Sequence, residues 1–464
     1  MTKVHFLGIN GSGIIGVACM AKQEGFDVDG CDISESGNYS QQLRELNIHT
    51  YVGHNAEHLK DKDYLVVSPA IYFNDKYKTI EEVCKARELG VKELKWQTFL
   101  DRFLANNKTF ITVCGTHGKT STTTFVSNLL ENADLDPSCI IGGMNPKWNA
   151  NFRTGKGKYF VCEADEYAHN FHEYHPNYII LNNVEMEHPE FFNNYKEYEK
   201  NFIDFLHNIK DNGTIIFNCD DINSLDVISK IKDFAKEHNI TILGFTSSNF
   251  DIEDNFIKHS LIKIINEKEF ILDGEKYTLK NVNGRHNIYN LSAVILLAKA
   301  LGISQNIIKE NVENAFLPKR RMEKIFDNEH IKIFDDYAHH HSQIFYNLST
   351  LKNTIKDNEK IIAILEPHLI SRFRDNSKEF LDYMEIADYS IITKFFKSRE
   401  EKLPDLNMDY YLKGRKTKYI EKFDDVAKEV KDIVNNNPDN TFYIVVMGAG
   451  LSYKLSQQLK QQFI

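Results

Sequence analysis

A glycine-rich loop in the middle of the chain has the residue types that bind phosphate. Residues 115–120 read GTHGKT, follow a β-branched run at 109–114 and precede a helical stretch. The backbone N–H groups of such a loop, together with the positive end of the following helix, cradle a polyphosphate. Lys119 is expected to reach the β- and γ-phosphates, and the Thr120 hydroxyl is expected to bind Mg²⁺. The loop departs from the pattern G-x-x-x-x-G-K-[ST], because Val113 stands at its first glycine.

Carboxylates follow a second strand-like run. Residues 163–166 read EADE directly after the run at 159–162, and His188 comes shortly after the run at 178–181. Carboxylate oxygens are preferred ligands of Mg²⁺, and ligands of parallel sheets bind at the carboxyl ends of the strands. The sequence therefore predicts a magnesium site here. A lone histidine such as His188 is, by itself, more often a structural hydrogen-bonding group.

A second glycine motif lies near the N-terminus. Residues 11–16 read GSGIIG after a strand-like run at 4–7, and Asp32 closes the next run. This pattern is typical of dinucleotide-binding domains, so an NAD(P)-dependent dehydrogenase is one hypothesis. The motif is short, and no set of residues for hydride transfer accompanies it. A regulatory or transport ATPase without a ligation step is another hypothesis.

Alternating strand and helix patterns indicate the elements that must position these residues. Short β-branched runs, each followed by a polar or glycine-rich turn and a helical stretch, predict βαβ units and an α/β fold with parallel, doubly wound sheets. Polar seams near 105–108 and 317–321 divide the chain into domains at 1–107, 108–318 and 319–464. Three domains also suit the 464 residues of the chain, at ~150 residues per domain.

Composition limits the class of protein. With 42% hydrophobic and 26% charged residues, the chain has the composition of a globular protein. The net charge of −10 argues against a nucleic-acid partner. No apolar run approaches the ~20 residues of a membrane span, and the N-terminus does not resemble a signal peptide, so we expect a cytoplasmic protein without a membrane partner. Seven cysteines without a C-x-x-C pair predict reduced, buried thiols rather than disulfides or a zinc site.

Four motifs together resemble the Mur ligases, which are ATP-dependent amide-bond-forming enzymes of bacterial cell-wall precursor synthesis. The motifs lie at 115–120, 163–166, 182–188 and 286–290, in the order found in that family. The resemblance implies a Rossmann-like N-terminal domain for UDP-N-acetylmuramate, a central P-loop ATPase-like domain for ATP, and a Rossmann-like C-terminal domain for the amino acid. It further implies ATP as co-substrate, Mg²⁺ as cofactor, and a monomer or homodimer.

The resemblance also implies a role for individual residues. The UDP-sugar is assigned Gly8, Gly11, Ser12, Gly13, Gly16, Asp32 and Ser68; ATP is assigned Gly115, Thr116, His117, Gly118, Lys119, Thr120, Ser121, Asn287, Asn290, Arg321 and Asp336; Mg²⁺ is assigned Thr120, Glu163 and His188; and the amino acid is assigned Tyr337, His368 and Arg372. Lys119, Glu163, His188 and Arg321 are the expected catalytic residues. Side-chain amides suit the edge of adenine, and a guanidinium fork suits phosphate.

The acceptor is less sharply indicated. Segments at 201–208, 366–375 and 448–450 resemble the branch that adds L-alanine, whereas 163–167, 180–183 and 319–323 resemble the branch that attaches a recycled tripeptide. Because the acceptor is read by the C-terminal domain, we expect L-alanine.

Several positions depart from the family pattern. Glu187, His341 and Leu369 stand where the family has aspartate, proline and arginine, which leaves open a divergent member acting on a related UDP-linked precursor. Other members carry a carbamylated lysine after the histidine segment. Asn201 occupies that neighbourhood here and suits the alanine branch, although Lys200 lies beside it.

Overall fold

Parallel strands alternate with helices along the chain, as the β-branched runs predict. The computed structural model describes residues 1–35, 37, 39–72, 77–188, 191–248, 256–397, 400 and 403–464. By their internal contacts these residues form two units, Met1–Val282 with Asn287–Phe316, and Asn283–His286 with Leu317–Ile464. Within the described residues, no helix has both the length and the apolar character that a membrane span requires.

The N-terminal sheet is parallel throughout and has the strand order β3-β2-β1-β4-β5. Its strands are β1 (Lys3–Leu7), β2 (Asp27–Asp32), β3 (His49–Val52), β4 (Tyr64–Val67) and β5 (Lys92–Lys95). Its helices are α1 (Ile14–Gln23), α2 (Ser40–Glu45), η1 (Ala56–Leu59), α3 (Pro69–Tyr72), η2 (Tyr77–Thr79), α4 (Glu81–Leu89), α5 (Trp96–Phe99) and η3 (Leu100–Leu104). Apolar residues on both faces of the strands are buried against helices, as expected for a doubly wound sheet.

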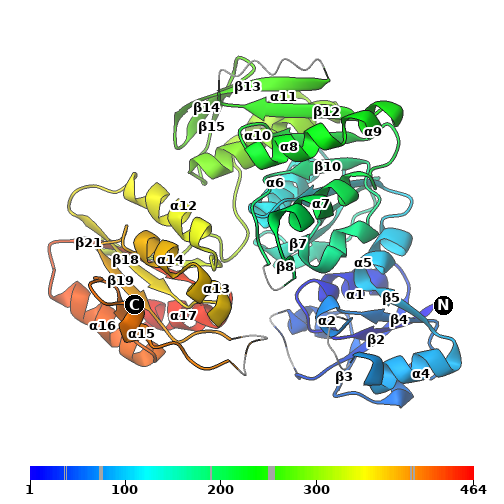
Figure 1. Cartoon of the computed structure of the whole chain (residues 1–464), viewed down its shortest axis with the longest axis horizontal. Helices are drawn as coiled ribbons and strands as arrows, with labels where there is room; N and C mark the ends of the chain where they lie inside the picture. Colours follow the sequence, from blue (N-terminus) through cyan, green and yellow to red (C-terminus); the bar gives the residue numbers. More distant parts are fainter. Residues whose placement is uncertain are drawn as a thin grey trace. The chain divides into compact units, whose positions relative to one another are not determined.

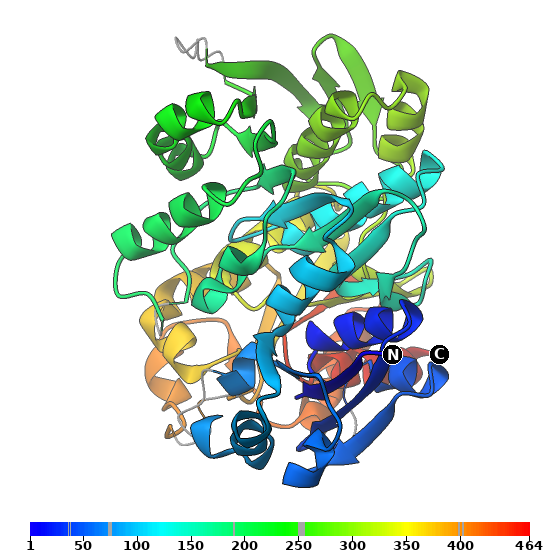
Figure 2. The same cartoon turned by 90° about the vertical axis from the view of Figure 1, so that its right-hand side faces the viewer.

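The central sheet has the order β15-β14-β13-β12-β11-β10-β6-β9-β7-β8. Its strands are β6 (Thr109–Cys114), β7 (Ser138–Asn145), β8 (Ala150–Arg153), β9 (Tyr159–Glu163), β10 (Tyr178–Leu181), β11 (Thr214–Asn218), β12 (Thr241–Thr246), β13 (Ile257–Asn266), β14 (Glu269–Leu272) and β15 (Glu275–Thr278). Its helices are α6 (Lys119–Asn132), η4 (Tyr167–Glu173), α7 (Tyr195–Leu206), α8 (Ile222–Lys230), α9 (Lys232–Glu237), α10 (Arg285–Ala300) and α11 (Gln305–Glu313). The β13–β15 edge and the N-terminal sheet lie at opposite ends of this unit (Figure 1 and Figure 2).

The C-terminal unit contains a sheet in the order β16-β17-β21-β18-β19-β20. Its strands are β16 (Glu323–Asp327), β17 (Ile331–Asp336), β18 (Glu359–Leu365), β19 (Tyr389–Ile392), β20 (Lys418–Tyr419) and β21 (Thr441–Met447). Its helices are α12 (His341–Lys352), α13 (Ile370–Asp375), α14 (Ser377–Met384), α15 (Met408–Tyr411), α16 (Phe423–Asn435) and α17 (Ser452–Phe463). Separate apolar clusters cover the two faces of this sheet.

The α/β class with parallel sheets is confirmed, with differences at the edges. The pairs β13–β14, β14–β15, β7–β8 and β16–β17 are antiparallel, because short turns join these neighbours and leave no room for a crossover helix. The N-terminal and central sheets belong to one unit, so the boundary at residue 107 stays a prediction. None of the described cysteines forms a disulfide, and all of them are buried except Cys84, which is exposed.

Candidate functional site

The phosphate loop joins the end of β6 to the start of α6. Gly115 and Gly118 have φ of +120° and +83°, a backbone region that favours glycine. A Cβ at Gly115 would lie 2.8 Å from the Asn183 carbonyl oxygen, and a Cβ at Gly118 would lie 2.8 Å from Oδ1 of Asn290. Only glycine therefore lets the loop pass between the end of β10 and helix α10.

Side chains after β10 hold the loop in place. The Thr116 amide donates to the Asn183 carbonyl (3.1 Å), and the His117 amide donates to Oδ1 of Asn183 (2.8 Å). The His117 carbonyl accepts from the side-chain amides of Asn182 (3.2 Å) and Asn183 (3.1 Å). The Thr116 hydroxyl lies 2.8 Å from both the Glu185 carbonyl and the Tyr198 hydroxyl. The loop is thus fixed by the neighbouring strand.

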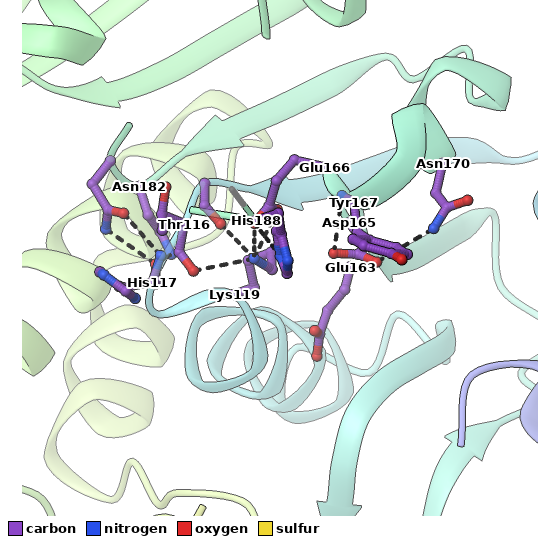
Figure 3. A network of polar contacts seen from close by, with 12 residues as sticks. Thr116, His117, Lys119, Glu163, Asp165, Glu166, Tyr167, Asn170, Asn182 and His188 are labelled. Carbon is purple, nitrogen blue, oxygen red and sulfur yellow. Dashed lines mark hydrogen bonds and ion pairs between the residues drawn. The ribbon is translucent and has the colours of Figure 1, made fainter. Parts of the chain in front are cut away.

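Lys119 stands at the centre of the polar network (Figure 3). Its Nζ donates to the carbonyls of Gly115 (2.7 Å) and Thr116 (3.2 Å) and to Oε2 (2.8 Å) and Oε1 (3.1 Å) of Glu166. Burial works against its charge, but Glu166 and Asp165 raise the pKa of Lys119 well above its ordinary value. Lys119 is therefore a fixed cation in the curl of the loop.

Acidic groups outnumber basic groups around Lys119. Three potential metal ligands lie together: one ligand atom from each of Asp165, Glu166 and His188 is within 4.8 Å of the other two. Glu166 is fully buried, and this burial, together with Asp165 and Glu187, raises its pKa although Lys119 opposes the shift. A divalent cation relieves such a surplus of carboxylates, so the donor set fits Mg²⁺.

His188 lies on the same cluster in a strained backbone conformation. Its Nε2 is 3.8 Å from Oε1 of Glu166, and its ring packs edge-on against Tyr167 at 4.9 Å between centroids. The φ of His188 is +58°, which is uncommon for a residue with a side chain. Non-glycine residues in this region concentrate at functional sites.

Thr120 and Glu163 form a separate contact beside this cluster. The Thr120 hydroxyl donates to Oε2 of Glu163 (3.3 Å), and Oε1 of Glu163 accepts from the Gly142 amide on β7. The residues predicted to bind Mg²⁺ therefore fall into two groups, Thr120 with Glu163 and His188 with Asp165 and Glu166. A hydroxyl beside a carboxylate at the start of α6 also fits a magnesium ion on a bound triphosphate.

Helix α10 brings the predicted adenine-binding residues to the loop. Asn287 and Asn290 are buried, and Asn290 contacts Gly118. Ser121 lies in the first turn of α6. The loop and Asn290 thus meet within one unit, whereas contacts of Asn287 and Asn290 with a nucleotide stay a prediction.

The N-terminal glycine loop divides into two parts. Gly8 has φ of +79°, and a Cβ there would lie 3.1 Å from Cβ of Ser68; the Ser68 Oγ would lie 3.7 Å from a Cβ at Gly11. These residues meet at the carboxyl ends of β1 and β4, where ligands bind in parallel sheets. Gly13 packs against Trp96, where a Cβ would approach the ring to 3.0 Å.

The second part of this loop contacts the central sheet. A Cβ at Gly16 would lie 3.3 Å from Cβ of Phe152, and the Ser12 carbonyl accepts from the side chain of Asn151 (2.7 Å). Asp32 accepts from the amides of Asn10 and Ser34, each at 3.1 Å. Packing alone thus accounts for Gly16, and its proposed role toward a diphosphate stays a prediction.

In the C-terminal unit, predicted ligand residues gather after β17. Asp336 is buried and accepts from the amides of Met322 (2.6 Å) and Ala338 (2.7 Å), and its burial raises its pKa although Arg321 opposes the shift. The guanidinium carbon of Arg321 lies 5.4 Å from the centre of the Tyr337 ring, and that of Arg320 lies 5.2 Å from it. Tyr337 therefore sits against two guanidinium groups.

Two of the predicted amino-acid-binding residues, Tyr337 and His368, are linked through a further histidine. The His339 ring packs edge-on against Tyr337 (5.4 Å) and His368 (5.5 Å). Arg372 is buried in α13, and His368 precedes this helix. Where the family has proline, His341 is the first residue of α12, a helix position that proline also favours. The turn after 337–340 therefore needs no rearrangement.

Lys200 and Asn201 point to different surroundings. The Lys200 side chain is 71% exposed and pairs with Asp204. Asn201 is buried, and its Nδ2 donates to the Glu166 carbonyl (3.0 Å). Its Oδ1 lies 2.5 Å from Nδ1 of His169. Asn201, not Lys200, therefore faces the carboxylate cluster.

Comparisons with known proteins cover nearly the whole chain. The Mur ligase family catalytic domain matches residues 3–108, the Mur ligase middle domain matches residues 113–298, and the Mur ligase glutamate ligase domain matches residues 320–450. The chain belongs to the Mur ligase family. Members of the Mur ligase family are ATP-dependent amide ligases, so the dehydrogenase and the ATPase without ligation are excluded.

Individual relatives of this Mur ligase align over nearly their full length. The UDP-N-acetylmuramate–L-alanine ligase of Caldicellulosiruptor saccharolyticus is 31% identical, with 97% of this chain and 96% of the relative covered. That of Sulfurihydrogenibium sp. is 30% identical, with 98% and 97% covered. Among solved structures, the UDP-N-acetylmuramate-alanine ligase of Thermotoga maritima has a TM-score of 0.77 at 25% identity, with 100% and 99% covered.

Several residues of this Mur ligase site were not singled out by sequence reasoning. Glu166 is the partner of Lys119, Asn183 fixes the loop, Tyr198 contacts Thr116, and Asn201 supports the carboxylate cluster. Glu166 and Asn183 lie inside recognised motifs, so their segments were found but not their roles. Tyr198 and Asn201 lie on α7 at buried positions of an amphipathic helix, which by itself indicates packing.

Proposed function

We propose that this Mur ligase joins L-alanine to the carboxylate of UDP-N-acetylmuramate at the expense of ATP, in the synthesis of peptidoglycan precursors. The observation that carries the proposal is the position of the Lys119 ammonium. Lys119 is the first residue of α6, and two loop carbonyls and Glu166 hold its ammonium group. The full-length relatives named as L-alanine ligases support the choice of substrates. Glycine-lined β1 and β4 ends provide the proposed site for the UDP-sugar.

The first transfer activates the carboxylate. A carboxylate oxygen of the muramate attacks the γ-phosphorus of ATP, and the bond between the γ-phosphorus and the β-phosphate oxygen breaks. ADP departs, and the muramate carboxylate becomes an acyl phosphate. Lys119 binds the transferring phosphoryl oxygens, where electrostatic stabilisation is worth most. Thr120 and Glu163, with Asp165, Glu166 and His188, would hold Mg²⁺, which neutralises phosphate charge when bound.

The second transfer makes the amide. The neutral amino group of L-alanine attacks the acyl carbon, phosphate leaves, and the nitrogen loses a proton. In our proposal Arg372 binds the alanine carboxylate through its guanidinium fork, with His368 and Tyr337 beside it. Because an acyl phosphate hydrolyses in water, the second transfer requires that water be kept from the reacting carbon.

Replacement of Lys119 tests the assignment. We expect Lys119→Ala to lower amine-dependent phosphate release by at least ~100-fold, as for loss of one donor to the developing charge. Calorimetric binding of UDP-N-acetylmuramate should persist, because the N-terminal glycine loop is unchanged. The matched control is Lys196→Ala, which changes an exposed lysine and should keep full turnover. A Lys119→Ala enzyme with most of its turnover would refute the proposal.

The recycled tripeptide is the second candidate acceptor. A murein peptide ligase from Psychrobacter arcticus shares the fold with a TM-score of 0.68 at 22% identity, with 99% of this chain and 98% of that chain covered. Residues 163–167 resemble that branch. Competition between L-alanine and the tripeptide in one reaction separates the two branches.

A further inference from the structure

Ligating side chains meet on one face of the N-terminal sheet, away from the phosphate loop. His5 on β1 pairs in register with Asp29 on β2, and Cys31 lies two residues further along β2. Because side chains alternate along a strand, these three share one face of the sheet. Helices α4 and η1 contribute Glu82 and His58 to the same place. Figure 1 shows β2, β3 and α4 together in this domain.

The ligand atoms lie close enough together to surround one ion. Nε2 of His5 lies 3.3 Å from Sγ of Cys31, Sγ lies 3.3 Å from Oε1 of Glu82, and that oxygen lies 2.9 Å from Nδ1 of His58. One ligand atom from each of the four lies within 4.8 Å of the others. A tetrahedral zinc ion with bonds of about 2.0–2.3 Å holds its ligands about 3.3–3.8 Å apart. The four groups thus need only small shifts to bind such an ion.

Asp29 orients His5 as a ligand. Oδ1 of Asp29 lies 2.8 Å from Nδ1 of His5, and Oδ2 accepts from Nζ of Lys62 (2.6 Å). A neutral imidazole carries one ring proton, and with Asp29 as acceptor at this distance that proton lies on Nδ1. The Nε2 lone pair therefore faces Cys31. A carboxylate behind the imidazole is the usual support of a metal-binding histidine.

The cluster has too few protons to satisfy its own acceptors. The Cys31 thiol has one proton, yet Nε2 of His5 and Oε1 of Glu82 both lie 3.3 Å from its sulfur. Oε1 of Glu82 already accepts from the Asn55 amide (2.8 Å) and contacts His58. Oε2 accepts no hydrogen bond from the described residues, although Nδ1 of His54 lies 3.2 Å from it. A cation at the centre would satisfy these lone pairs together.

We propose that His5, Cys31, His58 and Glu82 bind a divalent cation of the zinc class, with Asp29 as the positioning residue behind His5. On binding, the Cys31 thiol loses its proton to solvent, and His58 carries its single proton on Nε2 so that Nδ1 coordinates. Thiolate and carboxylate then balance the two positive charges of the ion, and the buried site stays neutral. Thiolate, imidazole and carboxylate are zinc ligands, and four protein ligands indicate a structural rather than a catalytic ion.

The site connects to the glycine loop through the backbone. The Cys31 carbonyl accepts from the amides of Gly8 (2.8 Å) and Ile9 (3.1 Å). A cation bound at Cys31 would therefore fix the end of β2 and the start of the loop proposed for the UDP-sugar. His54, whose side chain is 27% exposed, lies at the rim of the cluster. Binding of this cation does not depend on the proposed ligase activity.

Cobalt substitution tests the site directly. Chelator-treated full-length protein is titrated with Co²⁺ in excess Mg²⁺, and the near-ultraviolet absorption of a cobalt–thiolate bond is recorded. We expect the band to saturate at one equivalent and to be displaced by Zn²⁺. The band should vanish in Cys31→Ser and persist in Cys84→Ser, which changes an exposed thiol of the same domain. Asp29→Asn should keep the band but weaken Co²⁺ affinity about 10–100-fold.

The wild-type titration remains decisive if Cys31→Ser fails to fold. Absence of a thiolate band in the wild type, or its persistence in a folded Cys31→Ser protein, would overturn the proposal and leave a hydrogen-bonded cluster only. An Asp29→Asn protein with unchanged affinity would overturn the role given to Asp29. Lys119→Ala should leave the spectrum unchanged, so failure of the ligase proposal and failure of this site are distinguishable.

Discussion

Replacing Glu166 by glutamine removes the charge that pairs with the Lys119 ammonium. Oε2 of Glu166 lies 2.8 Å from Nζ, and the two side chains are 0% and 15% exposed. Unit charges at that separation attract by about 6 kcal/mol at an effective dielectric constant of ~20. Loss of one partner from a buried pair costs about 3–5 kcal/mol, because the other charge is left without compensation. Glutamine still accepts a hydrogen bond and Asp165 remains nearby. Burial and the neighbouring carboxylates, which raise the pKa of Glu166, already oppose its charge, so we expect the lower end of this range, about 3 kcal/mol.

Calorimetric unfolding measures this loss. In a domain of about 200 residues, the size predicted for the central domain, 1 kcal/mol corresponds to roughly 2–4 °C in Tm. On that prediction, we expect the transition of the central domain to fall by roughly 6–12 °C. The matched control is Asp204→Asn, which removes the charge from an exposed pair with Lys200. Such a helical pair contributes about 0.3–0.5 kcal/mol, so its Tm should change by no more than about 2 °C.

The same variant reports on catalysis. If Glu166 keeps the Lys119 amine in the curl of the loop, Glu166→Gln should also raise the KM for ATP, whereas Asp204→Asn should not. Equal changes of Tm in the two variants, or a Glu166→Gln enzyme with unchanged Tm and unchanged KM for ATP, would refute the reasoning. The pair would then be no more than a surface-type contact.

Three further predictions follow from the same geometry. Gly118→Ala should lower ATP-dependent turnover by ~10-fold or more, because its Cβ would meet Asn290. The control is Gly302→Ala. Gly302 has a similar φ of +73°, and a Cβ added there would have no atom within 4 Å. Gly302→Ala should cost only about 1 kcal/mol of stability. Equal losses of turnover in Gly118→Ala and Gly302→Ala would contradict the role given to the contact with Asn290. Burial lowers the pKa of His286 to about 4 from its ordinary value of 6.5. As the pH falls from 6.5 to 4, the unfolded chain therefore binds more protons, and the folded state loses up to about 3.4 kcal/mol. Between pH 7 and pH 5 the expected part of this loss is about 2 kcal/mol. Denaturation at these two pH values should show that loss in the wild type and less of it in His286→Gln, and identical losses would argue against it. Lys200→Ala should keep full turnover, and an inactive variant would place a carbamylated lysine in the site.

The phosphate loop could be predicted because its information is local. A buried strand, two glycines at positive φ and a helix that begins at Lys119 are contiguous in the chain. The partner of Lys119 could not be read in the same way. Residues 163–166 offer three carboxylates, and only the bend after β9 decides that Glu166 meets the lysine while Glu163 meets Thr120.

Long-range assembly accounts for what the sequence concealed. Absence of a C-x-x-C pair argued against a zinc site, yet His5, Cys31, His58 and Glu82 converge from four separate elements. The G-x-G-x-x-G motif follows β1 as the sequence predicts, but the close contact of Gly16 with Phe152 on β8 cannot be seen without the central sheet. Such contacts depend on how helices and strands pack together. Residues that are neighbours in the sequence do not by themselves determine that packing.

One competition reaction tests the central claim most directly. Wild-type enzyme receives ATP, UDP-N-acetylmuramate labelled with ¹⁸O in its carboxylate, and equimolar L-alanine, glycine, L-serine and tripeptide, and the products are read by mass spectrometry. We expect the L-alanyl product to predominate and each released phosphate to carry one ¹⁸O atom, because the carboxylate oxygen is transferred through the acyl phosphate. Preference for the tripeptide would contradict the acceptor, and unlabelled phosphate would contradict the two-transfer mechanism.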